Sequence, residues 1–212
     1  MKITSAAFNC SAPDLESCPE VALPEFAFIG RSNVGKSSLL NALTGRKDLA
    51  KVSKTPGHTK MINFFTINNR WRLVDLPGYG FAQVARENKE KFNHAVNNYL
   101  INRENLFGVF VLIDSRHEPQ KIDLEFVRFL GSKAVSIVLV FTKIDKSSPG
   151  KVQKNIDLFK ESILESFEEL PEIFTCSSVT KTGLTELLGV IDEALAGKPE
   201  VELESDSPTP WG

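Results

Sequence analysis

Residues 30–37, Gly-Arg-Ser-Asn-Val-Gly-Lys-Ser, have the composition and spacing of a loop that binds phosphate. An apolar run at 26–29 precedes them and a helix-like run at 38–43 follows, which is the strand–GxxxxGK[ST]–helix context of a P-loop. Glycine lets backbone N–H groups approach phosphate oxygens, and the helix adds the positive end of its dipole. We therefore expect Lys36 to contact the β- and γ-phosphates of a nucleotide and the Ser37 hydroxyl to bind Mg²⁺. The alternative is a glycine-rich turn that matches the phosphate-loop pattern by chance. The motifs further along the chain help to decide between the two interpretations.

A second motif, Asp75-Leu76-Pro77-Gly78, ends a strand-like run at 71–76. At that place the Asp75 carboxylate can hold Mg²⁺ through water, and the Gly78 N–H can contact a γ-phosphate. The alternative is an ordinary DxxG turn.

Two further patterns are suited to contact the base of a nucleotide. Thr142-Lys143-Ile144-Asp145 follows an apolar run at 135–141, and there Asp145 can accept two hydrogen bonds from guanine N1 and N2 while the Lys143 stem lies along the ring. Adenine offers no such pair of donors, so Asp145 disfavours an ATP-dependent small-molecule kinase. Ser177-Ser178 follows a short strand at 172–176 and can present backbone N–H to guanine O6. Each pattern alone has a trivial alternative, such as a surface Lys–Asp pair, but their order predicts a GTP-binding domain.

The elements around these motifs alternate between buried strands and amphipathic helices. Strands are expected at 26–29, 62–67, 71–76, 107–114, 135–141 and 172–176, with helices at 38–43, 88–101, around 122–130, at 151–167 and at 184–195. This alternation indicates an α/β fold with a mainly parallel sheet covered on both faces, in which ligands bind at the carboxyl ends of the strands. We expect residues 1–25 to form an N-terminal arm packed on the domain, 26–197 the domain itself and 198–212 a disordered acidic tail.

The bulk composition is that of one ordinary globular domain: 212 residues, 42% hydrophobic and 25% charged. The net charge of −2 divides into −3 in residues 198–212 and +1 elsewhere, so nucleic-acid binding must depend on local patches. Three cysteines without a CxxC and three histidines without ligand spacing predict reduced thiols and no structural metal. The apolar runs are short, and residues 1–5 lack the apolar core of a signal peptide. We expect a cytoplasmic monomer that neither inserts into membranes nor binds DNA.

These motifs resemble those of the EngB (YihA/YsxC) family of Era-like bacterial GTP-binding proteins. The resemblance extends from about residue 3 to 195 and is carried by residues 24–39, by Lys-Thr-Pro-Gly-His-Thr at 54–59, by Asp-Leu-Pro-Gly-Tyr-Gly at 75–80 and by the threonine at 142. It implies a Ras-like P-loop GTPase with a mostly parallel six-stranded sheet. The family motif Ser-Ala differs here, because Ser178 replaces the alanine.

The resemblance also implies roles for residues that spacing cannot identify. Thr59 becomes the switch threonine that joins Ser37 and Asp75 at Mg²⁺, and 57–60 and 78–85 become the two nucleotide-sensing loops. The full set expected at GTP or GDP is Gly30, Arg31, Ser32, Asn33, Val34, Gly35, Lys36, Ser37, Ser38, Gly57, His58, Thr59, Lys60, Met61, Asp75, Leu76, Pro77, Gly78, Thr142, Lys143, Ile144, Asp145, Cys176, Ser177 and Ser178.

Slow hydrolysis is expected, because Tyr79 stands where signalling GTPases have the glutamine that orients the attacking water. We identify no general base, and expect Lys36, Thr59 and Gly78 to contact the γ-phosphate in the transition state. Asn33 is a candidate ligand for an activating K⁺, since related GTPases with asparagine there bind K⁺; the alternative is that Asn33 only stabilises the loop.

The expected partner is a precursor of the large ribosomal subunit, its rRNA and proteins, with a link to cell division and septation; both are implied by the resemblance. Basic residues in or beside the sensing loops could meet RNA phosphates, unless they form only a solvated face: Arg46, Lys47, Lys51, Lys54, His58, Lys60, Arg86, Lys89 and Lys91. The alternative function is a nucleotide-gated interaction protein that acts directly on the division machinery without contacting the ribosome.

Overall fold

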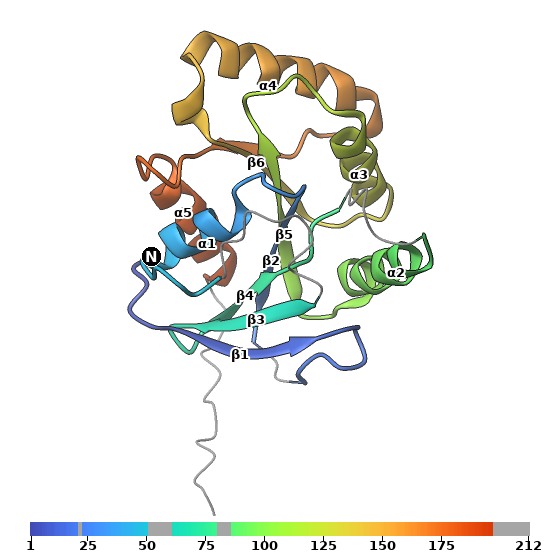
Figure 1. Ribbon diagram of the computed structural model, residues 1–212, viewed down its shortest axis with the longest axis vertical. Helices are drawn as coiled ribbons and strands as arrows, with labels where there is room; N and C mark the ends of the chain where they lie inside the picture. The colour runs from blue at the N-terminus through green and yellow to red at the C-terminus, as the bar shows by residue number, and fades with distance from the viewer. Residues whose placement is uncertain (21–22, 51–60, 80–85, 197–212) are drawn as a thin grey trace, which may run out of the picture.

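One seven-stranded sheet runs through the centre of the molecule (Figure 1). The structure is a computed structural model and describes residues 1–20, 23–50, 61–79 and 86–196, with the backbone alone from 86 to 93. The order of the strands is β1-β3-β4-β2-β5-β6-β7. Their bounds are β1 Ala6–Ala12, β2 Glu25–Gly30, β3 Ile62–Ile67, β4 Trp71–Asp75, β5 Leu106–Asp114, β6 Ile137–Thr142 and β7 Glu172–Thr175.

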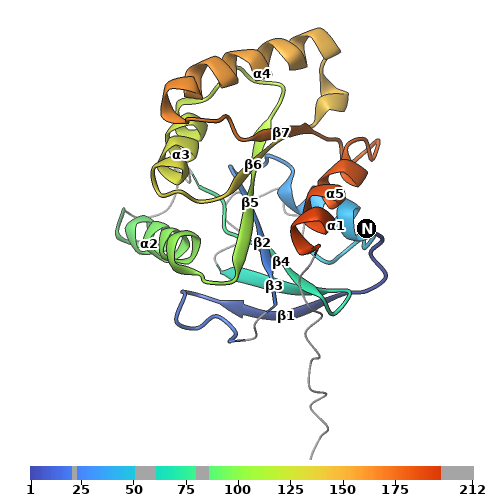
Figure 2. The ribbon, with the colours of Figure 1, turned by 180° about the vertical axis from the view of Figure 1, so that it is seen from behind.

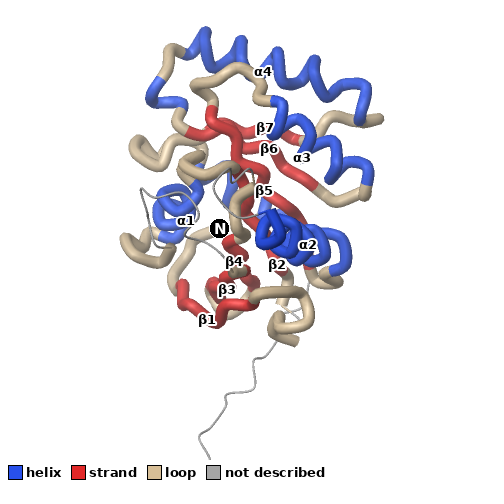
Figure 3. The backbone as a smooth tube through the Cα atoms, turned by 45° about the vertical axis from the view of Figure 1, so that its right-hand side comes forward, coloured by secondary structure: helices blue, strands red, loops and turns tan. Residues whose placement is uncertain are grey.

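Helices cover both faces of this sheet, as the sequence predicts. They are α1 Lys36–Thr44, α2 Arg86–Asn102, α3 Lys121–Ser132, α4 Pro149–Ile163 and α5 Leu184–Leu195, with short 3-10 turns η1 Ile144–Lys146 and η2 Leu164–Ser166. α1 and α5 lie on one face of the sheet, and α2, α3 and α4 lie on the other (Figures 2 and 3). The apolar side chains of each group form a separate core with the sheet. Among the described residues no helix is both long and apolar enough to cross a membrane.

The pairing of the strands brings the chemical motifs to one edge of the sheet. β2 lies parallel to both β4 and β5, β5 is parallel to β6, and β6 is parallel to β7. In this register Phe28 lies beside Asp75, Gly30 beside Leu112, and Asp114 beside Thr142. The loops that follow β2, β4, β5, β6 and β7 therefore emerge together at the carboxyl edge, where parallel α/β sheets bind their ligands.

The expected number of six strands is wrong by one, because the N-terminal segment enters the sheet. β1 pairs antiparallel with β3, aligning Ala6 with Ile67 and Ala12 with Ile62. Residues 8–12 of its sequence, AAFNCSA, alternate between apolar and polar side chains, but so short a run does not identify the strand with which it pairs. Its partner also lies far along the chain, so local pattern reveals only an extended piece. The division into arm, domain and tail stays a prediction, and the tail lies outside the described residues.

The turn between β3 and β4 fixes the start of β1. Asn68 and Asn69 both have positive φ, 51° and 53°, as a two-residue hairpin turn matched to the strand twist requires. The Asn68 carboxamide oxygen accepts hydrogen bonds from the backbone of Thr4 and Ser5, and its amide donates to the Lys2 carbonyl. The hairpin thus holds the N-terminal segment alongside β3.

The amino edge of the sheet carries a buried ionic cluster, away from the loops at the carboxyl edge. Glu25, the first residue of β2, is fully buried and accepts a 2.7 Å hydrogen bond from the Tyr99 hydroxyl. Arg103 donates to both Glu25 carboxylate oxygens, and Arg72 lies 3.6 Å from one of them. Arg103 also donates to the Pro19 carbonyl, so the cluster joins the N-terminal segment to α2 and β2.

Apolar periodicity explains the buried face of α4 fully but that of α3 only in part. Val152, Ile156, Phe159 and Ile163 on α4 are buried at helical spacing. On α3, however, Ile122 is 37% exposed while Val127 and Leu130 are buried, together with the acidic Asp123. Periodicity alone does not predict a carboxylate on the buried face of a helix, and Asp123 is important at the site.

Candidate nucleotide-binding site

The phosphate loop, residues 30–37, has the backbone geometry of a close-fitting cradle. A Cβ atom on Gly30 would lie 2.8 Å from the Leu112 carbonyl oxygen and 2.9 Å from Val34 Cγ1, so only glycine fits there. Gly35 has φ 103°, which glycine alone adopts readily. Asn33 has φ 63°, a left-handed conformation for which asparagine is one of the better-suited residues.

The first turn of α1 is open to an anion. Among the described residues no side chain caps the helix, and its first turn contains no acidic residue. The leading N–H groups of a helix are unsatisfied within the helix, and they favour negative charge. The Ser32 hydroxyl is enclosed nearby without a hydrogen-bond partner in the part of the chain that the structure describes. These unpaired donors fit a phosphate chain.

Lys36 and Asp75, the residues predicted to hold phosphate and Mg²⁺, contact each other. The Lys36 ammonium forms an ion pair with the Asp75 carboxylate, and both side chains are buried. Removing two charges from water is costly, and mutual pairing offsets that cost. Ser37 lies in the first turn of α1, so a hydroxyl and a carboxylate flank the same lysine. Oxygen ligands of this kind suit Mg²⁺ completed by phosphate and water.

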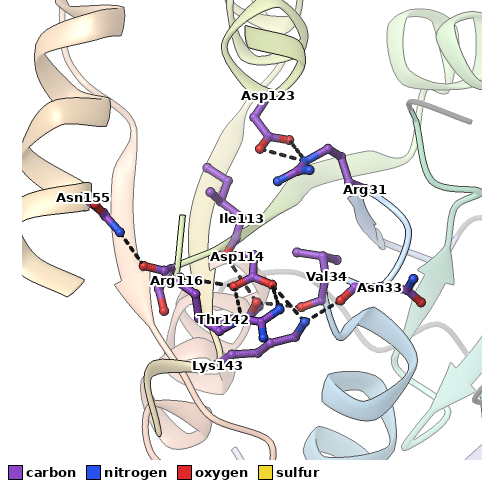
Figure 4. Close-up of polar contacts among 11 residues, drawn as sticks. Arg31, Asn33, Val34, Ile113, Asp114, Arg116, Asp123, Thr142, Lys143 and Asn155 are labelled. Carbon is purple, nitrogen blue, oxygen red and sulfur yellow. Dashed lines mark hydrogen bonds and ion pairs between the residues drawn. The ribbon is translucent and has the colours of Figure 1, made fainter. Parts of the chain in front are cut away.

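The loop after β6 holds the phosphate loop in place (Figure 4). The Thr142 hydroxyl donates a 2.7 Å hydrogen bond to the Val34 carbonyl. The Lys143 ammonium donates to the Asn33 carbonyl and forms a 2.9 Å ion pair with Asp114. A motif expected to recognise the base therefore also fixes two consecutive carbonyls of the phosphate loop. Spacing gave no indication of this second role.

Asp114, at the end of β5, orients Lys143. It accepts a bidentate pair of bonds from Arg116, at 2.9 and 2.8 Å, as well as the bond from Lys143. Burial by itself would raise the pKa of the Asp114 carboxyl, but the hydrogen bonds from Arg116 and Lys143 outweigh it and hold the pKa well below its usual range. Asp114 is therefore ionised, and Lys143 lies between a carboxylate and a carbonyl (Figure 4).

The predicted guanine loops, residues 142–145 and 177–178, meet at Asp145 and Ser177. The buried Ser177 hydroxyl donates a 2.7 Å hydrogen bond to Asp145 Oδ1 and accepts from the N–H groups of Val179 and Thr180. This bond, with the Lys146 ammonium 3.2 Å from Oδ2, holds the pKa of the Asp145 carboxyl below its usual value. An ionised, oriented carboxylate can accept the two N–H groups of guanine.

The two serines differ in what they can offer a base. The Ser177 N–H donates to the Thr182 carbonyl at 3.0 Å, so it is used within the loop. Within the described part of the chain, the next N–H, that of Ser178, has no such bond. Cys176 lies behind them: burial raises the pKa of its thiol to about 12, so it is a neutral packing group.

The segment after β4 packs against the phosphate loop. A Cβ atom on Gly78 would lie 2.5 Å from the Gly30 carbonyl oxygen, so the two backbones are in direct contact. The next residue, Tyr79, is buried, stacks on Phe126 of α3 at 4.2 Å between ring centroids, and donates a 2.8 Å hydrogen bond to Asp123. Burial and the Asp123 carboxylate raise the pKa of Tyr79 well above its usual value. The Tyr79 side chain is therefore held in the interior against α3.

Asp123 also binds the phosphate loop itself. Arg31 Nε lies 3.0 Å from both oxygens of the buried Asp123 carboxylate. Burial raises the pKa of Asp123, and the charge of Arg31 opposes that effect. The residue was not expected from the sequence, because Asp123 is 92 positions from Arg31 and belongs to no motif.

Several predicted site residues lie outside the described part of the chain. They are Gly57, His58, Thr59 and Lys60, as well as Lys51 and Lys54. Met61 is described and is 38% exposed, just before β3. Of the expected basic patches, Arg46 and Lys47 are exposed after α1, whereas Arg86, Lys89 and Lys91 are described only by their backbone in α2.

Comparisons with known proteins agree with this geometry. Residues 25–143 match the family model of the 50S ribosome-binding GTPases. The chain is 52% identical over 192 residues to the probable GTP-binding protein EngB of Porphyromonas gingivalis, covering 91% of this chain and 96% of that protein. It is 51% identical over 192 residues to that of Christiangramia forsetii, covering 91% and 97%.

Solved structures are similar at lower identity. A crystal structure of a probable GTP-binding protein engB matches with a TM-score of 0.64 and 27% identity, over 81% of this chain and 98% of that one. Era bound to MgGDPNP and nucleotides 1506–1542 of 16S ribosomal RNA matches with a TM-score of 0.67 and 25% identity, over 86% of this chain and 60% of that one.

Proposed function

This chain belongs to the EngB family of GTP-binding proteins, within the ribosome-binding GTPases, and on that basis we propose that it is a GTP-controlled switch in the assembly of the large ribosomal subunit. A link to cell division and septation belongs to the same proposal. We further place the protein in the cytoplasm as a monomer.

The observation that carries the nucleotide site is the convergence of separate loops at one edge of the sheet. The phosphate loop, Asp75–Gly78 and the guanine loops follow strands β2, β4, β6 and β7, and direct contacts join neighbouring members. Asp145 supplies guanine specificity, because its ionised carboxylate matches two donors that adenine lacks. The residues assigned to the nucleotide are those expected from the sequence.

Binding of GTP must exchange partners at the Lys36–Asp75 ion pair. Phosphate oxygens would bind the Lys36 ammonium, and the Asp75 carboxylate would then be free to hold Mg²⁺ through water, beside the hydroxyls of Ser37 and Thr59. The metal neutralises phosphate charge when bound. If only the nucleotide binds, Asp75 is left as a buried charge without its counter-charge, and if only Mg²⁺ binds, Lys36 is. The nucleotide and Mg²⁺ therefore support each other's binding.

Hydrolysis is proposed to be slow without a partner. Tyr79 is buried, bound to Asp123 and stacked on Phe126, so it does not orient a water molecule as glutamine does in signalling GTPases. An activating group must therefore come from outside the chain, either from a partner or from a K⁺ ion at Asn33. The left-handed backbone of Asn33 also gives the residue a structural role. The variant Asn33→Gly separates this structural role from binding of K⁺.

The ribosomal part of the proposal draws on the family and on the described basic residues. The matched family is that of 50S ribosome-binding GTPases, and the similar Era structure contains ribosomal RNA. Exposed Arg46 and Lys47 directly follow the carboxyl end of α1, ahead in sequence of residues 57–60, which the resemblance makes the first sensing loop. Positive charge there would meet RNA phosphates with an affinity that falls steeply with salt.

Co-sedimentation with isolated ribosomal subunits tests the proposal. Purified protein would be spun with each subunit in a non-hydrolysable GTP analogue, in GDP and across a salt series. We expect pelleting with the large subunit in the analogue only, and a steep loss with salt. Binding to neither subunit in any state would contradict the ribosomal role, leave the GTP site intact, and favour a protein partner in the division machinery.

A further inference from the structure

Two side chains from different parts of the site meet at one buried carboxylate. Asp123 of α3 accepts the Tyr79 hydroxyl at 2.8 Å and Arg31 Nε at 3.0 Å. Arg31 belongs to the phosphate loop, and Tyr79 directly follows Gly78, the glycine expected to sense the γ-phosphate. The side chain of Asp123 is 1% exposed, so water does not compete for these bonds. A carboxylate on α3 thus joins the two segments that must meet the end of the phosphate chain.

The position of Gly78 depends on this carboxylate from one side and on backbone contact from the other. Its α-carbon packs so closely on the phosphate loop that an added Cβ would lie 2.5 Å from the Gly30 carbonyl oxygen and 3.6 Å from Ser32 N. The neighbouring Tyr79 ring is confined between this turn and Phe126, with the hydroxyl bound to Asp123. Since the same carboxylate binds Arg31, the tyrosine is positioned relative to the phosphate loop rather than to α3 alone.

We propose that Asp123 is a positioning residue for nucleotide discrimination: through Tyr79 and Arg31 it holds Gly78 at the phosphate loop, so that the site prefers a nucleoside triphosphate to the diphosphate. This inference rests on the proposed GTP site and deepens it. Ordering a backbone N–H before the γ-phosphate arrives removes part of the entropy cost of binding the triphosphate. The diphosphate lacks the γ-phosphate that Gly78 is expected to contact, so holding Gly78 in place does not increase its affinity.

Removing the Tyr79 hydroxyl distinguishes this positioning role from ordinary packing in the core. Tyr79→Phe removes the bond to Asp123 but keeps the ring on Phe126. The matched control is Tyr99→Phe, since Tyr99 is also buried and donates a 2.7 Å bond to a buried carboxylate, Glu25, at the opposite edge of the sheet. Both variants lose the same kind of hydrogen bond, but only Tyr79 lies beside the phosphate loop.

The measurement is the dissociation constant of the full chain for GDP and for a non-hydrolysable GTP analogue, both with Mg²⁺. For Tyr79→Phe we expect analogue binding to weaken by about three- to tenfold, a part of the full value of one hydrogen bond to a charged group, while GDP binding changes by less than about twofold. Tyr99→Phe should leave the ratio of the two constants at its wild-type value. An unchanged ratio in Tyr79→Phe, or an equal change in Tyr99→Phe, would overturn the inference.

A second variant tests whether Asp123 acts through Tyr79. Asp123→Asn should lower the preference for the analogue at least as much as Tyr79→Phe, and the double variant should match Asp123→Asn alone. Additive effects would contradict a shared path. If Asp123→Asn does not fold, Tyr79→Phe still decides the question. If the wild-type protein binds neither nucleotide, the GTP site itself is refuted. If the wild-type protein binds both and Tyr79→Phe leaves the ratio of the two dissociation constants unchanged, only this inference is refuted.

Discussion

The hydroxyl of Thr142 donates a 2.7 Å hydrogen bond to the carbonyl of Val34, which lies 108 positions earlier in the chain. Both groups are buried, and the bond links the loop expected at the base to the loop expected at the phosphates. From the sequence, Thr142 is expected to contact the nucleotide, as the first residue of the motif that ends at Asp145. The geometry assigns this threonine to the support of the phosphate loop.

Thr142→Val should therefore weaken binding of GTP and GDP to a similar degree. The substitution keeps the shape of the side chain but leaves the buried Val34 carbonyl without its donor, at a cost of about 1–3 kcal/mol, or roughly tenfold in affinity. Thr142→Ser, which retains the hydroxyl, is the matched control. Titration with a fluorescent GDP and a fluorescent GTP analogue measures the effect. An effect confined to one nucleotide would argue against general support of the loop.

Asp145→Asn should exchange guanine for xanthine specificity. Asparagine replaces one acceptor oxygen with an amide donor, which conflicts with the guanine amino group and matches the xanthine carbonyl. We expect GTP affinity to fall by about a hundredfold or more, in line with a buried polar group left unpaired, and XTP to bind instead. Competition between XTP and labelled GTP measures this. Retained guanine preference would count against the assignment of Asp145.

Ser177→Ala should have a milder effect than Asp145→Asn. It removes the 2.7 Å bond to Asp145 but leaves the carboxylate in place. Guanine preference should persist while affinity declines by about three- to tenfold.

Hydrolysis should be faster in K⁺ than in Na⁺ if Asn33 is a ligand of an activating ion. Asn33→Gly is the informative variant, because glycine adopts the φ of 63° found here without strain and removes only the carboxamide. It should lose the K⁺ effect while keeping nucleotide affinity. Phosphate release from the isolated protein in matched K⁺ and Na⁺ buffers is the assay. Equal wild-type rates in the two salts would end the K⁺ hypothesis.

Asp114 should contribute to stability at neutral pH and lose that contribution in acid. Its pKa is depressed in the folded state, so the contribution is complete above the usual carboxyl pKa of about 3.9 and declines as pH falls towards the lower folded-state value. Asp114→Asn should cost about 1–3 kcal/mol at pH 7 through the lost charged hydrogen bonds to Arg116 and Lys143. Urea unfolding of both proteins should show that difference constant down to about pH 4 and smaller below. A difference that grows in acid would contradict the depressed pKa.

Local patterns predicted the fold class and the family, and the comparisons confirm both. The loop at 30–37, the hairpin of β3 and β4 and helix α5 are recognisable because glycine spacing, turn residues and apolar periodicity act within short segments. The assigned nucleotide ligands stay predictions, although the described ones lie at the expected edge of the sheet.

Contacts between distant segments could not be predicted in this way. Arg31 meets Asp123 across 92 positions and Tyr79 meets it across 44, and an aspartate in the first turn of a helix is usually an exposed partner of the helix dipole. β1 was missed for the same reason, because its strand character depends on β3. Tertiary pairing therefore determines which carboxylate, hydroxyl and strand take part in the site and the sheet.

The antiparallel pairing of β1 with β3 has a consequence for how the chain folds during synthesis. Ser11 bonds to Asn63, which is made 52 residues later. At translation rates of 5–20 residues per second, roughly 3–10 s pass before the first strand of the chain can find its neighbour. The N-terminal segment must therefore wait as an unpaired strand while β2 and α1 are made. Even so, β1 gains its strand partner before β2 does, because the neighbours of β2 in the sheet, β4 and β5, begin only at residues 71 and 106.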